Sequence, residues 1–301
     1  MALPDFQNKA VTLLGAGVSN MPLAGYLVSK GARVSARDKK SEADLGEDAQ
    51  KLRELGVSLI CGETYLENIR EDYVFRSPGF RPDLPALLEA KETGSAITSE
   101  MELFLENRPC PVIGITGSDG KTTSTTLVGK FLEAAALRVF VGGNIGTPLL
   151  DKCAEMTERD ACVLELSSFQ LMRMPHAPAY TAITNVSPNH LNWHVDFDEY
   201  VEAKKNIVGK NTKRLVVNAD CEITRDFGRE IAESGREVIF FSSSRANYGE
   251  IVGGSYPNAK AVYRRDGVIC ISDGESETEL LKESEIRLPG VHNIENYMTA
   301  M

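Results

Sequence analysis

The sequence is poor in histidine and tryptophan, and its cysteines form no recognisable pair motif. Its 301 residues include four histidines, one tryptophan and six cysteines. The cysteines are scattered along the chain, and none of them belongs to a Cys-x-x-Cys pair. This pattern is typical of reduced, mostly buried thiols, so we expect a cytoplasmic protein without a disulfide framework.

Two further absences limit the partners of the protein. Its formal net charge is −10, which argues against a nucleic acid or an anionic membrane surface as a partner. No apolar run is long enough to span a bilayer, and no basic region precedes an apolar core at the N-terminus, so we expect neither membrane insertion nor a signal peptide. An anionic substrate would therefore need local basic groups and backbone N–H donors.

The length and the order of the predicted elements indicate two α/β domains. A chain of 301 residues exceeds one ordinary domain. Strand-like and helix-like segments alternate, and the pattern restarts near Ser99. We therefore predict a first domain over residues 1–99 and a second domain over residues 100–301.

The first domain opens with a glycine-containing turn between a strand and a helix. A short apolar strand, Ala10–Leu14, precedes this turn, and the helix that follows it extends to about Lys30. A second strand, Ala32–Ala36, leads to Asp38. This order is typical of a Rossmann-like domain. Because the turn lacks the third glycine of the dinucleotide motif, it is weak support for NAD, and Asp38 alone does not decide the ligand.

The most informative stretch is a glycine-rich loop in the second domain. It reads Thr-Gly-Ser-Asp-Gly-Lys-Thr-Thr over residues 116–123, between a predicted strand at Pro111–Ile115 and a predicted helix at Thr122–Ala136. Such loops direct backbone N–H groups and a helix N-terminus at phosphate oxygens. Lys121 would reach the β- and γ-phosphates, and the hydroxyl of Thr122 would hold Mg²⁺. The match to Gly-x-x-x-x-Gly-Lys-Thr is imperfect, because isoleucine stands at the first glycine.

Later strands of the second domain end in polar residues. Predicted strands at Ala161–Leu164 and Tyr180–Thr184 are followed by Glu165 and Asn185, and open α/β sheets present their sites at such ends. Glu165 suits a second Mg²⁺ ligand downstream of a phosphate loop, or simply an exposed acid that begins a turn. Further strands are predicted at Leu215–Val217 and Val238–Phe241, and a β-hairpin at Val262–Ile271 around Asp266-Gly267.

Three other segments carry candidate site residues. The loop over residues 185–194 contains His190, a better metal or phosphate contact than an average histidine because it follows a buried strand. The predicted helix Asp198–Lys210 carries Lys204 and Lys205, which composition alone favours as solvated lysines. In the glycine-rich loop over residues 142–148, Asn144 is the side chain that can both donate and accept in a site.

Taken together, these segments resemble the Mur ligase family. The motifs Thr-Gly-x-x-Gly-Lys-Thr-Thr, Gly-Gly-Asn-Ile-Gly, Glu-Leu-Ser-Ser-Phe-Gln-Leu, Ser-Pro-Asn-His-Leu-Asn-Trp-His, Tyr-Val-Glu-Ala-Lys and His-Asn-x-x-Asn occur in this order. The resemblance covers essentially the whole chain. It implies a Rossmann-like N-terminal domain followed by a central ATPase domain that contains the phosphate loop.

The resemblance also implies an activity. The Glu-Leu-Ser-Ser-Phe-Gln-Leu segment and the Rossmann-like start favour the family member that adds D-glutamate to UDP-N-acetylmuramoyl-L-alanine in peptidoglycan synthesis. Such an enzyme is an ATP-dependent amide-forming ligase that works through an acyl phosphate. A carboxylate is a poor acyl donor, and phosphorylation supplies a leaving group. ATP, two Mg²⁺ ions, UDP-N-acetylmuramoyl-L-alanine and D-glutamate are therefore the implied cofactors and substrates of a monomeric protein.

Residue roles carry over position by position. The catalytic and metal-binding residues implied are Lys121, Thr122, Glu165, His190 and Lys204, the last as a carbamylated lysine. The implied ATP contacts are Gly117, Ser118, Asp119, Gly120, Lys121, Thr122, Thr123, Asn293 and Asn296. The implied contacts to the UDP-substrate are Gly15, Gly17, Val18, Ser19, Asp38, Lys39, Ser77, Gly79, Asn144, Ser167 and Gln170.

Three positions depart from the family pattern. Asp119 stands where asparagine is more common, and Asn189 and Asn192 stand where aspartate is common. Losing two acids near the metal ions predicts weaker Mg²⁺ binding or a different orientation of His190.

Two other functions stay open beside the ligase. One is an NAD-linked oxidoreductase built on the first domain, which would leave the phosphate loop unexplained. The other is a non-catalytic nucleotide-sugar-binding module or regulator. The family enzyme has a third domain, whereas the last predicted helix of this sequence stops at Met301. We therefore expect the native sequence to continue, and we expect these residues to bind the UDP-substrate but to catalyse poorly alone.

Overall fold

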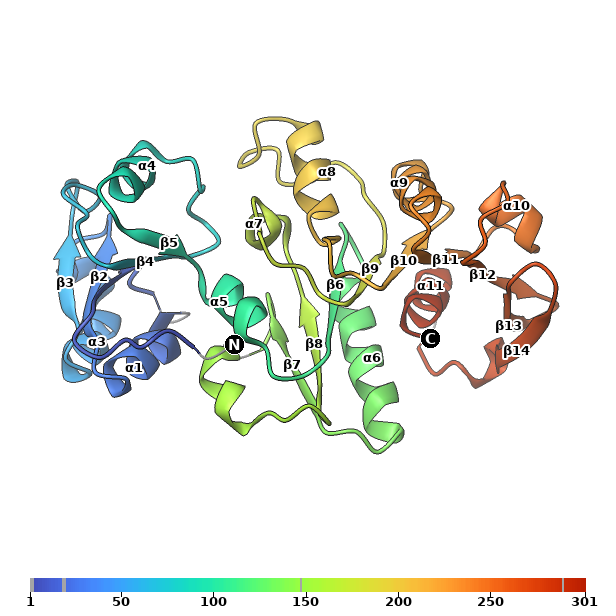
Figure 1. Cartoon of the computed structure of the whole chain (residues 1–301), viewed down its shortest axis with the longest axis horizontal. Coiled ribbons are helices and arrows are strands. Elements are labelled where there is room, and N and C mark those ends of the chain that lie inside the picture. Colours follow the sequence, from blue (N-terminus) through green and yellow to red (C-terminus); the bar gives the residue numbers. More distant parts are fainter. Residues whose placement is uncertain (1–2, 18–19, 147, 289) are drawn as a thin grey trace. The chain divides into compact units, whose positions relative to one another are not determined.

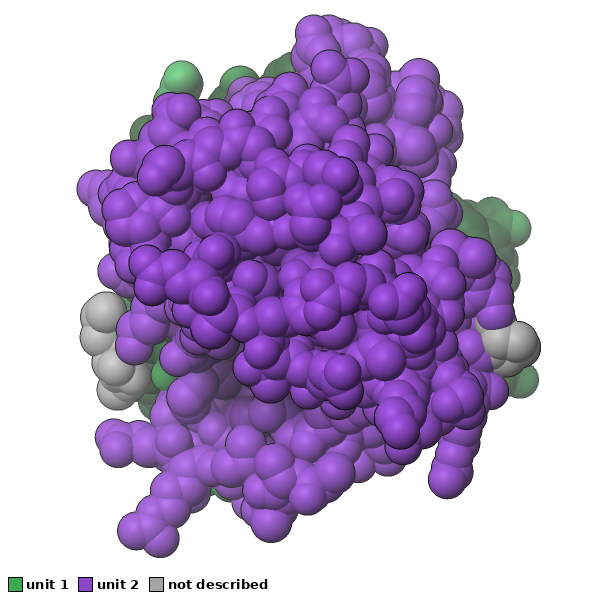
Figure 2. All heavy atoms as spheres, turned by 90° about the vertical axis from the view of Figure 1, so that its right-hand side faces the viewer, with its two compact units in different colours: residues 1–108, 148–156 green, residues 109–147, 157–301 purple. Residues whose placement is uncertain are grey.

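The protein forms two compact α/β units in a computed structural model that describes residues 3–17, 20–146, 148–288 and 290–301. One unit comprises residues 1–108 and 148–156, and the other comprises residues 109–147 and 157–301. Figure 1 traces the helices and strands, and Figure 2 colours the atoms by unit. The α/β fold class predicted from the sequence is confirmed.

Unit 1 contains, within its described residues, a five-stranded parallel sheet in the order β3-β2-β1-β4-β5. The strands are β1 (Ala10–Leu14), β2 (Arg33–Asp38), β3 (Ser58–Cys61), β4 (Tyr73–Arg76) and β5 (Ala96–Thr98). Residues of β1 are buried on both faces of the sheet, as expected for a central parallel strand. The chain changes direction across the sheet beside β1, so the turn after β1 lies at the topological switch point.

Helices cover both faces of this sheet. They are α1 (Met21–Ser29), α2 (Glu42–Leu45), α3 (Glu47–Glu54), α4 (Pro85–Glu92) and α5 (Glu100–Asn107), with the short 3₁₀ helix η2 (Leu150–Glu155). Figure 1 shows α1 and α3 on one face and α4 on the other. Proline in the first turn of α1 and of α4 suits a helix start, because the missing N–H would have no partner there.

Residues 148–156 join unit 1 through a buried carboxylate. Glu100, in the first turn of α5, accepts hydrogen bonds from the backbone N–H groups of Leu149 at 3.0 Å and Leu150 at 2.9 Å. Burial raises the pKa of Glu100. These contacts place α5 in unit 1, whereas the predicted division at residues 99 and 100 gave α5 to the second domain. That division stays a prediction about the family's domains.

Unit 2 is built on a nine-stranded sheet, counted over its described residues, in the order β14-β13-β12-β11-β10-β9-β6-β8-β7. The strands are β6 (Val112–Thr116), β7 (Val139–Gly143), β8 (Ala161–Glu165), β9 (Tyr180–Ile183), β10 (Arg214–Asn218), β11 (Glu237–Ser242), β12 (Ala259–Arg265), β13 (Val268–Ser272) and β14 (Glu277–Lys282). In this order, the neighbouring strands from β12 to β7 are parallel. Strand β13 pairs antiparallel with both β12 and β14. The predicted hairpin at Asp266-Gly267 is confirmed, with positive φ at both residues.

Helices lie on both faces of the second sheet as well. They are α6 (Lys121–Ala134), α7 (Ser168–Leu171), α8 (Phe197–Lys205), α9 (Glu222–Glu233), α10 (Tyr248–Val252) and α11 (Val291–Ala300), with the 3₁₀ helix η3 (Glu283–Glu285). In Figure 1, α8 and α9 lie on one face, and α6 and α11 lie on the other. The rings of Phe131 and Tyr297 meet edge-on at 6.0 Å between α6 and α11.

Helix α8 is shorter than predicted. It ends at Lys205, whereas the sequence suggested a helix to Lys210. The chain instead turns over residues 206–212, and Gly209 packs so tightly on Ala177 that a Cβ there would come within 2.7 Å of the Ala177 Cβ. Tertiary packing therefore ends the helix before its sequence pattern does.

Candidate functional site

The predicted phosphate loop joins β6 to α6 and bends through two glycines. Gly117 has φ +149°, and a Cβ at this position would lie 1.8 Å from the Thr184 Oγ1. Gly120 precedes α6 with φ +80°, and a Cβ there would lie 2.4 Å from the Asn296 Oδ1. Both positions therefore require glycine. The first N–H groups of a helix have no partner within that helix, which is the arrangement that binds phosphate.

Lys121 folds back over this loop. Its Nζ donates to the carbonyl oxygens of Gly117 at 3.0 Å and Ser118 at 2.8 Å. Burial lowers the pKa of Lys121, while the carboxylates of Glu165 and Asp119 act in the opposite direction. A phosphate would offer this half-buried cation a charged partner, which forms stronger hydrogen bonds than a carbonyl oxygen.

Glu165 meets two of the predicted site residues at the end of β8. Its side chain is 2% exposed. One carboxylate oxygen accepts a hydrogen bond from Thr122 Oγ1 at 2.7 Å, and the other accepts one from Asn144 Nδ2 at 2.8 Å. Hydrogen bonds thus hold together three side chains from β8, the start of α6 and the loop after β7, beside the phosphate loop.

The Thr122 hydroxyl and the Glu165 carboxylate fit a Mg²⁺ site. Both are hard oxygen donors, and they lie 2.7 Å apart. Among the described residues, no three histidine, cysteine, aspartate or glutamate side chains gather as a metal cluster. Mg²⁺ is usually held by one or two carboxylates together with water and substrate phosphates. The donors present therefore suit Mg²⁺ bound with a nucleotide better than a cation bound by protein alone.

Lys204 is buried beside the same loop. It lies on α8, is 2% exposed, and donates from Nζ to the Gly117 carbonyl at 2.6 Å. Its Nζ also lies 4.5 Å from the centroid of the Tyr200 ring. Burial and the nearby charge of Lys121 lower the pKa of Lys204 to about 7. A large fraction of the side chains is therefore neutral near neutral pH, unlike that of a solvated lysine.

The buried charge of Lys204 predicts a stability gain on its removal. The unfolded lysine keeps its proton up to about pH 10.5, so below pH 7 the folded protein carries the full cost of burying the charge, and this cost fades as pH rises from 7 to 10.5. At about 1.4 kcal/mol per pKa unit, less the cost of losing the hydrogen bond to the Gly117 carbonyl, Lys204→Met should raise the free energy of unfolding by about 2 kcal/mol at pH 6. Urea unfolding at pH 6 and pH 9.5 measures this, and lower stability at both pH values would contradict it.

Ser118 ties the phosphate loop to the loop after β9 and to α8. Its hydroxyl lies 2.8 Å from the Tyr200 hydroxyl and donates to the Ser187 carbonyl at 3.0 Å. It also accepts from the Ser187 N–H at 2.9 Å. The phosphate loop is therefore positioned by side-chain contacts from α8 as well as by its own glycines.

His190 is not brought to the Glu165 carboxylate. The residue is exposed, has φ +54°, and donates from its backbone N–H to the Asn189 Oδ1 at 2.8 Å. Its ring packs edge-on against Phe169 at 4.9 Å, and no hydrogen bond between described residues involves that ring. The Asn189 side chain, at a position where the resemblance gives aspartate as common, thus supports the turn at His190.

His194, a second histidine of the same loop, is buried in a chain of polar contacts that was not predicted from the sequence. The two ring nitrogens of His194 lie 2.9 Å from the Ser168 Oγ and 3.2 Å from the Glu199 Oε2. This chain connects α7, which follows Glu165, to the first turn of α8, which carries Lys204. In the sequence, His194 stood out only as the last residue of the Ser-Pro-Asn-His-Leu-Asn-Trp-His motif.

Ser167 and Gln170 form the N-terminal cap of α7. The Ser167 hydroxyl accepts from the Gln170 N–H at 3.3 Å, and the Gln170 Oε1 accepts from the Ser167 N–H at 3.0 Å. This reciprocal capping box explains why a serine and a glutamine stand three residues apart here. Their predicted contacts to a substrate stay a prediction.

A cavity of about 240 Å³ opens beside the phosphate loop. Its lining residues are Asp119, Gly120, Thr123, Thr184, Asn185, Phe241, His292, Glu295, Asn296 and Thr299. Asn296 is buried here, accepting from the Ser124 Oγ at 3.2 Å and donating to the Asn293 Oδ1 at 3.2 Å. The structure therefore brings together, near Gly120, the two asparagines that were predicted to contact ATP.

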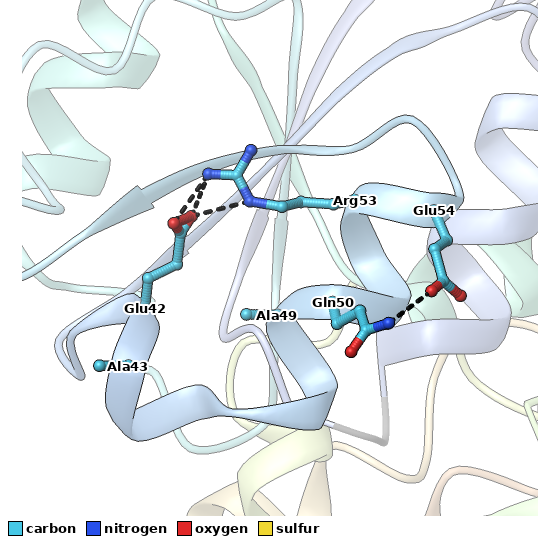
Figure 3. Close-up of a pocket in the computed structure, with 6 residues that line it drawn as sticks. All are labelled: Glu42, Ala43, Ala49, Gln50, Arg53 and Glu54. Carbon is cyan, nitrogen blue, oxygen red and sulfur yellow. Dashed lines mark hydrogen bonds and ion pairs between the residues drawn. The ribbon is translucent and has the colours of Figure 1, made fainter.

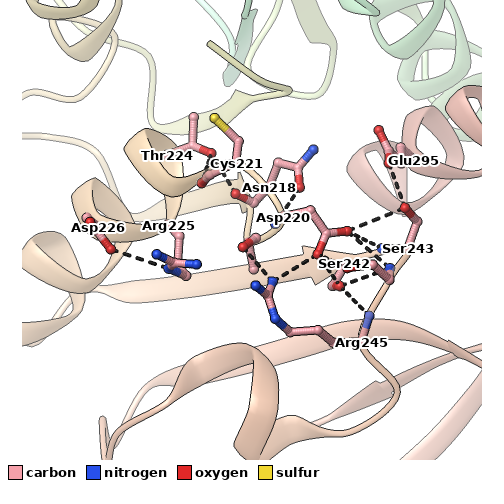
Figure 4. A network of polar contacts seen from close by, with 12 residues as sticks. Asn218, Asp220, Cys221, Thr224, Arg225, Asp226, Ser242, Ser243, Arg245 and Glu295 are labelled. Carbon is pink, nitrogen blue, oxygen red and sulfur yellow. Dashed lines mark hydrogen bonds and ion pairs between the residues drawn. The ribbon is translucent and has the colours of Figure 1, made fainter. Parts of the chain in front are cut away.

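Asp220 is the centre of a hydrogen-bond network at the C-terminal ends of β10 and β11. Its carboxylate accepts from the Ser242 Oγ at 2.6 Å, from the Ser243 N–H at 2.8 Å and from Arg245 Nη1 at 2.9 Å. It also accepts from both the N–H and the Oγ of Ser244. Figure 4 shows these contacts converging on one side chain. Burial alone would raise the pKa of Asp220, but the hydrogen bonds hold the pKa below its ordinary value.

This network predicts a loss of stability at low pH. A carboxylate with a depressed folded pKa stabilises the protein fully above about pH 4, and the contribution is lost as pH falls through the folded value. Asp220→Asn should therefore cost about 2 kcal/mol of unfolding free energy at pH 7 and less at pH 3. Urea unfolding measures both, with Asp226→Asn, an exposed acid of α9, as a control expected to change little. An equal loss for the two variants would contradict the assignment.

In unit 1, the turn after β1 is closed by three of the expected residues. Gly15 has φ +101°, and the Asn20 amide donates to its carbonyl at 2.7 Å and to Ser77 Oγ at 2.9 Å. The Asp38 carboxylate accepts from the Ala16 N–H at 2.9 Å. Asn20 replaces the third glycine of the dinucleotide motif. Its side-chain hydrogen bonds therefore stabilise this turn.

The other described positions of unit 1 that were predicted to contact the UDP-substrate are Gly17, Lys39 and Gly79. Lys39 and Gly79 are exposed, and a Cβ at Gly17 or Gly79 would meet no atom within 4 Å. Val18 and Ser19 lie outside the described residues. These positions stay predictions.

A second hollow in unit 1 contains none of the predicted residues. It lies over α2 and α3 and is lined by Glu42, Ala43, Ala49, Gln50, Arg53 and Glu54. Figure 3 shows the Arg53 guanidinium turned onto the Glu42 carboxylate, with which it forms an ion pair. The charges of Arg53 and Glu42 are therefore already paired within this hollow.

Comparison with known proteins identifies the family. Residues 115–301 match the Mur ligase middle domain. UDP-N-acetylmuramoylalanine–D-glutamate ligase of Ruminiclostridium cellulolyticum is 45% identical over 299 residues, covering 98% of this chain and 61% of that protein. The protein of that name from Acetivibrio thermocellus is 43% identical, covering 99% of this chain and 62% of its own length. The chain belongs to the Mur ligase family, and it spans about three-fifths of these relatives.

Solved structures share the fold. The UDP-N-acetylmuramate:L-alanyl-gamma-D-glutamyl-meso-diaminopimelate ligase from Neisseria meningitides superposes with a TM-score of 0.57 at 16% identity, covering 97% of this chain and 92% of that one. The UDP-N-acetylmuramate–alanine ligase from Thermotoga maritima gives 0.52 at 19% identity, covering 97% and 64%. At such identities the likeness shows the α/β fold alone.

No helix in the described segments combines the length and the apolar character required to cross a bilayer.

Proposed function

We propose that the full-length protein is an ATP-dependent ligase that joins D-glutamate to UDP-N-acetylmuramoyl-L-alanine in peptidoglycan synthesis. The observation that carries this proposal is the meeting of Lys121, Thr122 and Glu165 at one end of the sheet, where Lys204 of α8 also contacts the phosphate loop. Relatives that bear the name of this activity are 43% and 45% identical to nearly the whole chain.

The proposed reaction has two steps, phosphoryl transfer and amide formation. A carboxylate oxygen of the muramoyl-alanine substrate attacks the γ-phosphorus of ATP, and the bond from that phosphorus to ADP breaks. The amine of D-glutamate then attacks the carbonyl carbon of the acyl phosphate, phosphate leaves, and the amine gives up a proton. The first step brings two anions together, so positive charge and hydrogen-bond donors must lie where the negative charge develops.

Three groups of this chain supply what the first step needs. The phosphate loop presents N–H donors at the start of α6, and Lys121 neutralises charge on the transferred phosphoryl group. Thr122 and Glu165 would hold Mg²⁺, which supplies electrostatic stabilisation to the phosphate oxygens when bound. Asn144 keeps the Glu165 carboxylate in place through its 2.8 Å hydrogen bond.

Lys204 is proposed to act as a carbamate. The neutral amine attacks carbon dioxide, a C–N bond forms, and a proton is released, which leaves an anionic oxygen donor. Burial supports this step because it lowers the pKa of Lys204 to about 7 and so supplies the neutral amine. The carbamate oxygens and the His190 ring are the groups that we propose for a second Mg²⁺, which would require that ring to turn from its contact with Phe169.

The UDP-substrate is proposed to bind the turn after β1 in unit 1. The turn is pre-formed by Gly15, Ser77 and Asp38, and its position at the switch point of a parallel sheet supports a nucleotide diphosphate there. Asn144, Ser167 and Gln170 are proposed to contact the muramoyl end of that substrate. We also propose that the protein is monomeric and works in the cytoplasm, where ATP is available.

Calorimetry with three ligands tests the proposed function. We expect binding of UDP-N-acetylmuramoyl-L-alanine and of a Mg²⁺-bound, non-hydrolysable ATP analogue, and no binding of NADH. NADH binding without nucleotide-sugar binding would favour an oxidoreductase instead. Binding of the nucleotide-sugar without any Mg²⁺–nucleotide would favour a non-catalytic binding module.

A further inference from the structure

One carboxylate in the cavity beside the phosphate loop has no part in the reaction described above. Glu295 lies in α11 between Asn293 and Asn296, at a position that the His-Asn-x-x-Asn motif leaves open. It lines the cavity together with Gly120 and Thr123, which begin α6 at the phosphate end. Asp119 brings the other carboxylate to this cavity, and His292 brings its imidazole.

Glu295 is held by a chain of hydrogen bonds from the sheet edge. Its Oε1 accepts from the Ser243 Oγ at 2.6 Å, and Ser243 is itself fixed by its backbone N–H, which donates to Asp220 at 2.8 Å. The Ser243 hydroxyl lies 3.4 Å from Asp220, so its single proton serves Glu295. Figure 4 shows Glu295 meeting Ser243 at the edge of the Asp220 network. No hydrogen bond between described residues uses the Glu295 Oε2.

An ionised carboxylate with a spare oxygen accepts hydrogen bonds and cannot donate them. It also repels phosphate, so it suits the nucleoside part of a nucleotide and not its phosphates. Since Gly120 and Thr123 belong to the phosphate loop, a nucleotide bound there would direct its nucleoside into this cavity. The chemistry that would satisfy the Glu295 Oε2 is a neutral donor on that nucleoside, either a sugar hydroxyl or the base amino group.

We propose that Glu295 determines nucleotide specificity by accepting a hydrogen bond from the nucleoside of the bound nucleotide. This inference rests on the proposed function, because it takes ATP as the nucleotide. Ser243 is the positioning residue: it orients the carboxylate through Oε1 and leaves Oε2 for the ligand. Asp220 fixes Ser243 in turn.

The test is the binding of Mg²⁺-bound diphosphates to the 301-residue chain, measured by calorimetry. The ligands are ADP, 2′-deoxy-ADP, 3′-deoxy-ADP and inosine diphosphate, which lack a sugar hydroxyl or the base amino group in turn. Wild type should bind one of the three analogues about tenfold more weakly than ADP, as expected for losing a hydrogen bond to a charged group. The identity of that analogue distinguishes a sugar contact from a base contact.

The variant Glu295→Ala should lose about tenfold in affinity for ADP while binding the poorest analogue as well as wild type does. Ser243→Ala, which keeps the carboxylate, should show a smaller loss for ADP with the same analogue pattern. Glu233→Ala, an exposed acid of α9, is the matched control and should bind like wild type.

Two results would overturn the inference alone. Unchanged affinities in Glu295→Ala would mean that the carboxylate has no ligand, and an equal loss for all four diphosphates would mean that Glu295 only supports α11. If wild type binds no Mg²⁺–diphosphate at all, the proposed ATP function fails, and this inference fails with it.

Discussion

Replacing Lys121 by alanine is expected to lower ATP-dependent phosphoryl transfer about 100- to 1000-fold while leaving the affinity for UDP-N-acetylmuramoyl-L-alanine near normal. The side chain sits over the phosphate loop, 3.0 Å and 2.8 Å from the carbonyl oxygens of Gly117 and Ser118. Its positive charge matters most in the transition state, where the phosphoryl group lies between two anions. Phosphate release by the full-length protein measures the first quantity, and calorimetry measures the second.

The matched control for this variant is Lys130→Ala. Lys130 lies on the same helix, but its side chain is 69% exposed and pairs with Glu133 on the surface. The control should keep full activity, because an exposed ion pair of this kind contributes little. If Lys121→Ala lost substrate affinity and phosphoryl transfer to the same extent, the loop would be a structural element and not a catalytic one.

Replacing Lys204 by alanine is expected to inactivate the full-length enzyme, with partial recovery when a small carboxylate such as formate or acetate is added. The carbamate proposed for Lys204 supplies anionic oxygens, and a free carboxylate placed in the space left by the side chain supplies the same kind of donor. Lys204→Gln, which fills that space with a neutral amide, should be inactive and should not be rescued. Rates of phosphate release with and without added carboxylate measure the effect.

The neighbouring Lys205→Ala is the control for this second prediction. Lys205 is one residue along α8, yet it pairs with Glu202 and packs against the Phe227 ring away from the phosphate loop. It should retain activity, and added carboxylate should not change its rate. Full activity in Lys204→Ala would show that no carbamate is needed.

The elements around the phosphate loop could be predicted from the sequence because local signals agree there. A strand at residues 111–115 and a helix from 122 were expected, and β6 and α6 lie within two residues of those bounds. The hairpin at Asp266-Gly267 was equally clear, because two consecutive residues with positive φ have a distinct sequence signature. Where a glycine or an aspartate-glycine pair fixes the backbone, sequence alone is informative.

Other elements depend on contacts that no local pattern records. Strand β14 is mostly exposed and contains two glutamates, so its sequence does not read as a strand. It exists because β13 offers an antiparallel edge. The early end of α8 comes likewise from the close approach of Gly209 to Ala177. In both cases a distant partner overrides the local preference.

The site was predictable in part for the same reason. Glycine, lysine and threonine of the phosphate loop follow one another in sequence, so their shared role could be proposed before the fold was known. Lys204 could not be distinguished from Lys205 by composition, although one is buried and the other is partly exposed. His194 and Glu295 gave no separate signal, because their hydrogen-bond partners Ser168 and Ser243 are distant in sequence.

The central claim is that the phosphate loop aims the γ-phosphoryl group of ATP at a substrate carboxylate. It is tested most directly by labelling the carboxylate oxygens of UDP-N-acetylmuramoyl-L-alanine with ¹⁸O and supplying ATP, Mg²⁺ and D-glutamate to the full-length protein. The acyl-phosphate route predicts that the phosphate released carries one labelled oxygen from the substrate. Phosphate without the label, formed together with the amide product, would contradict the account.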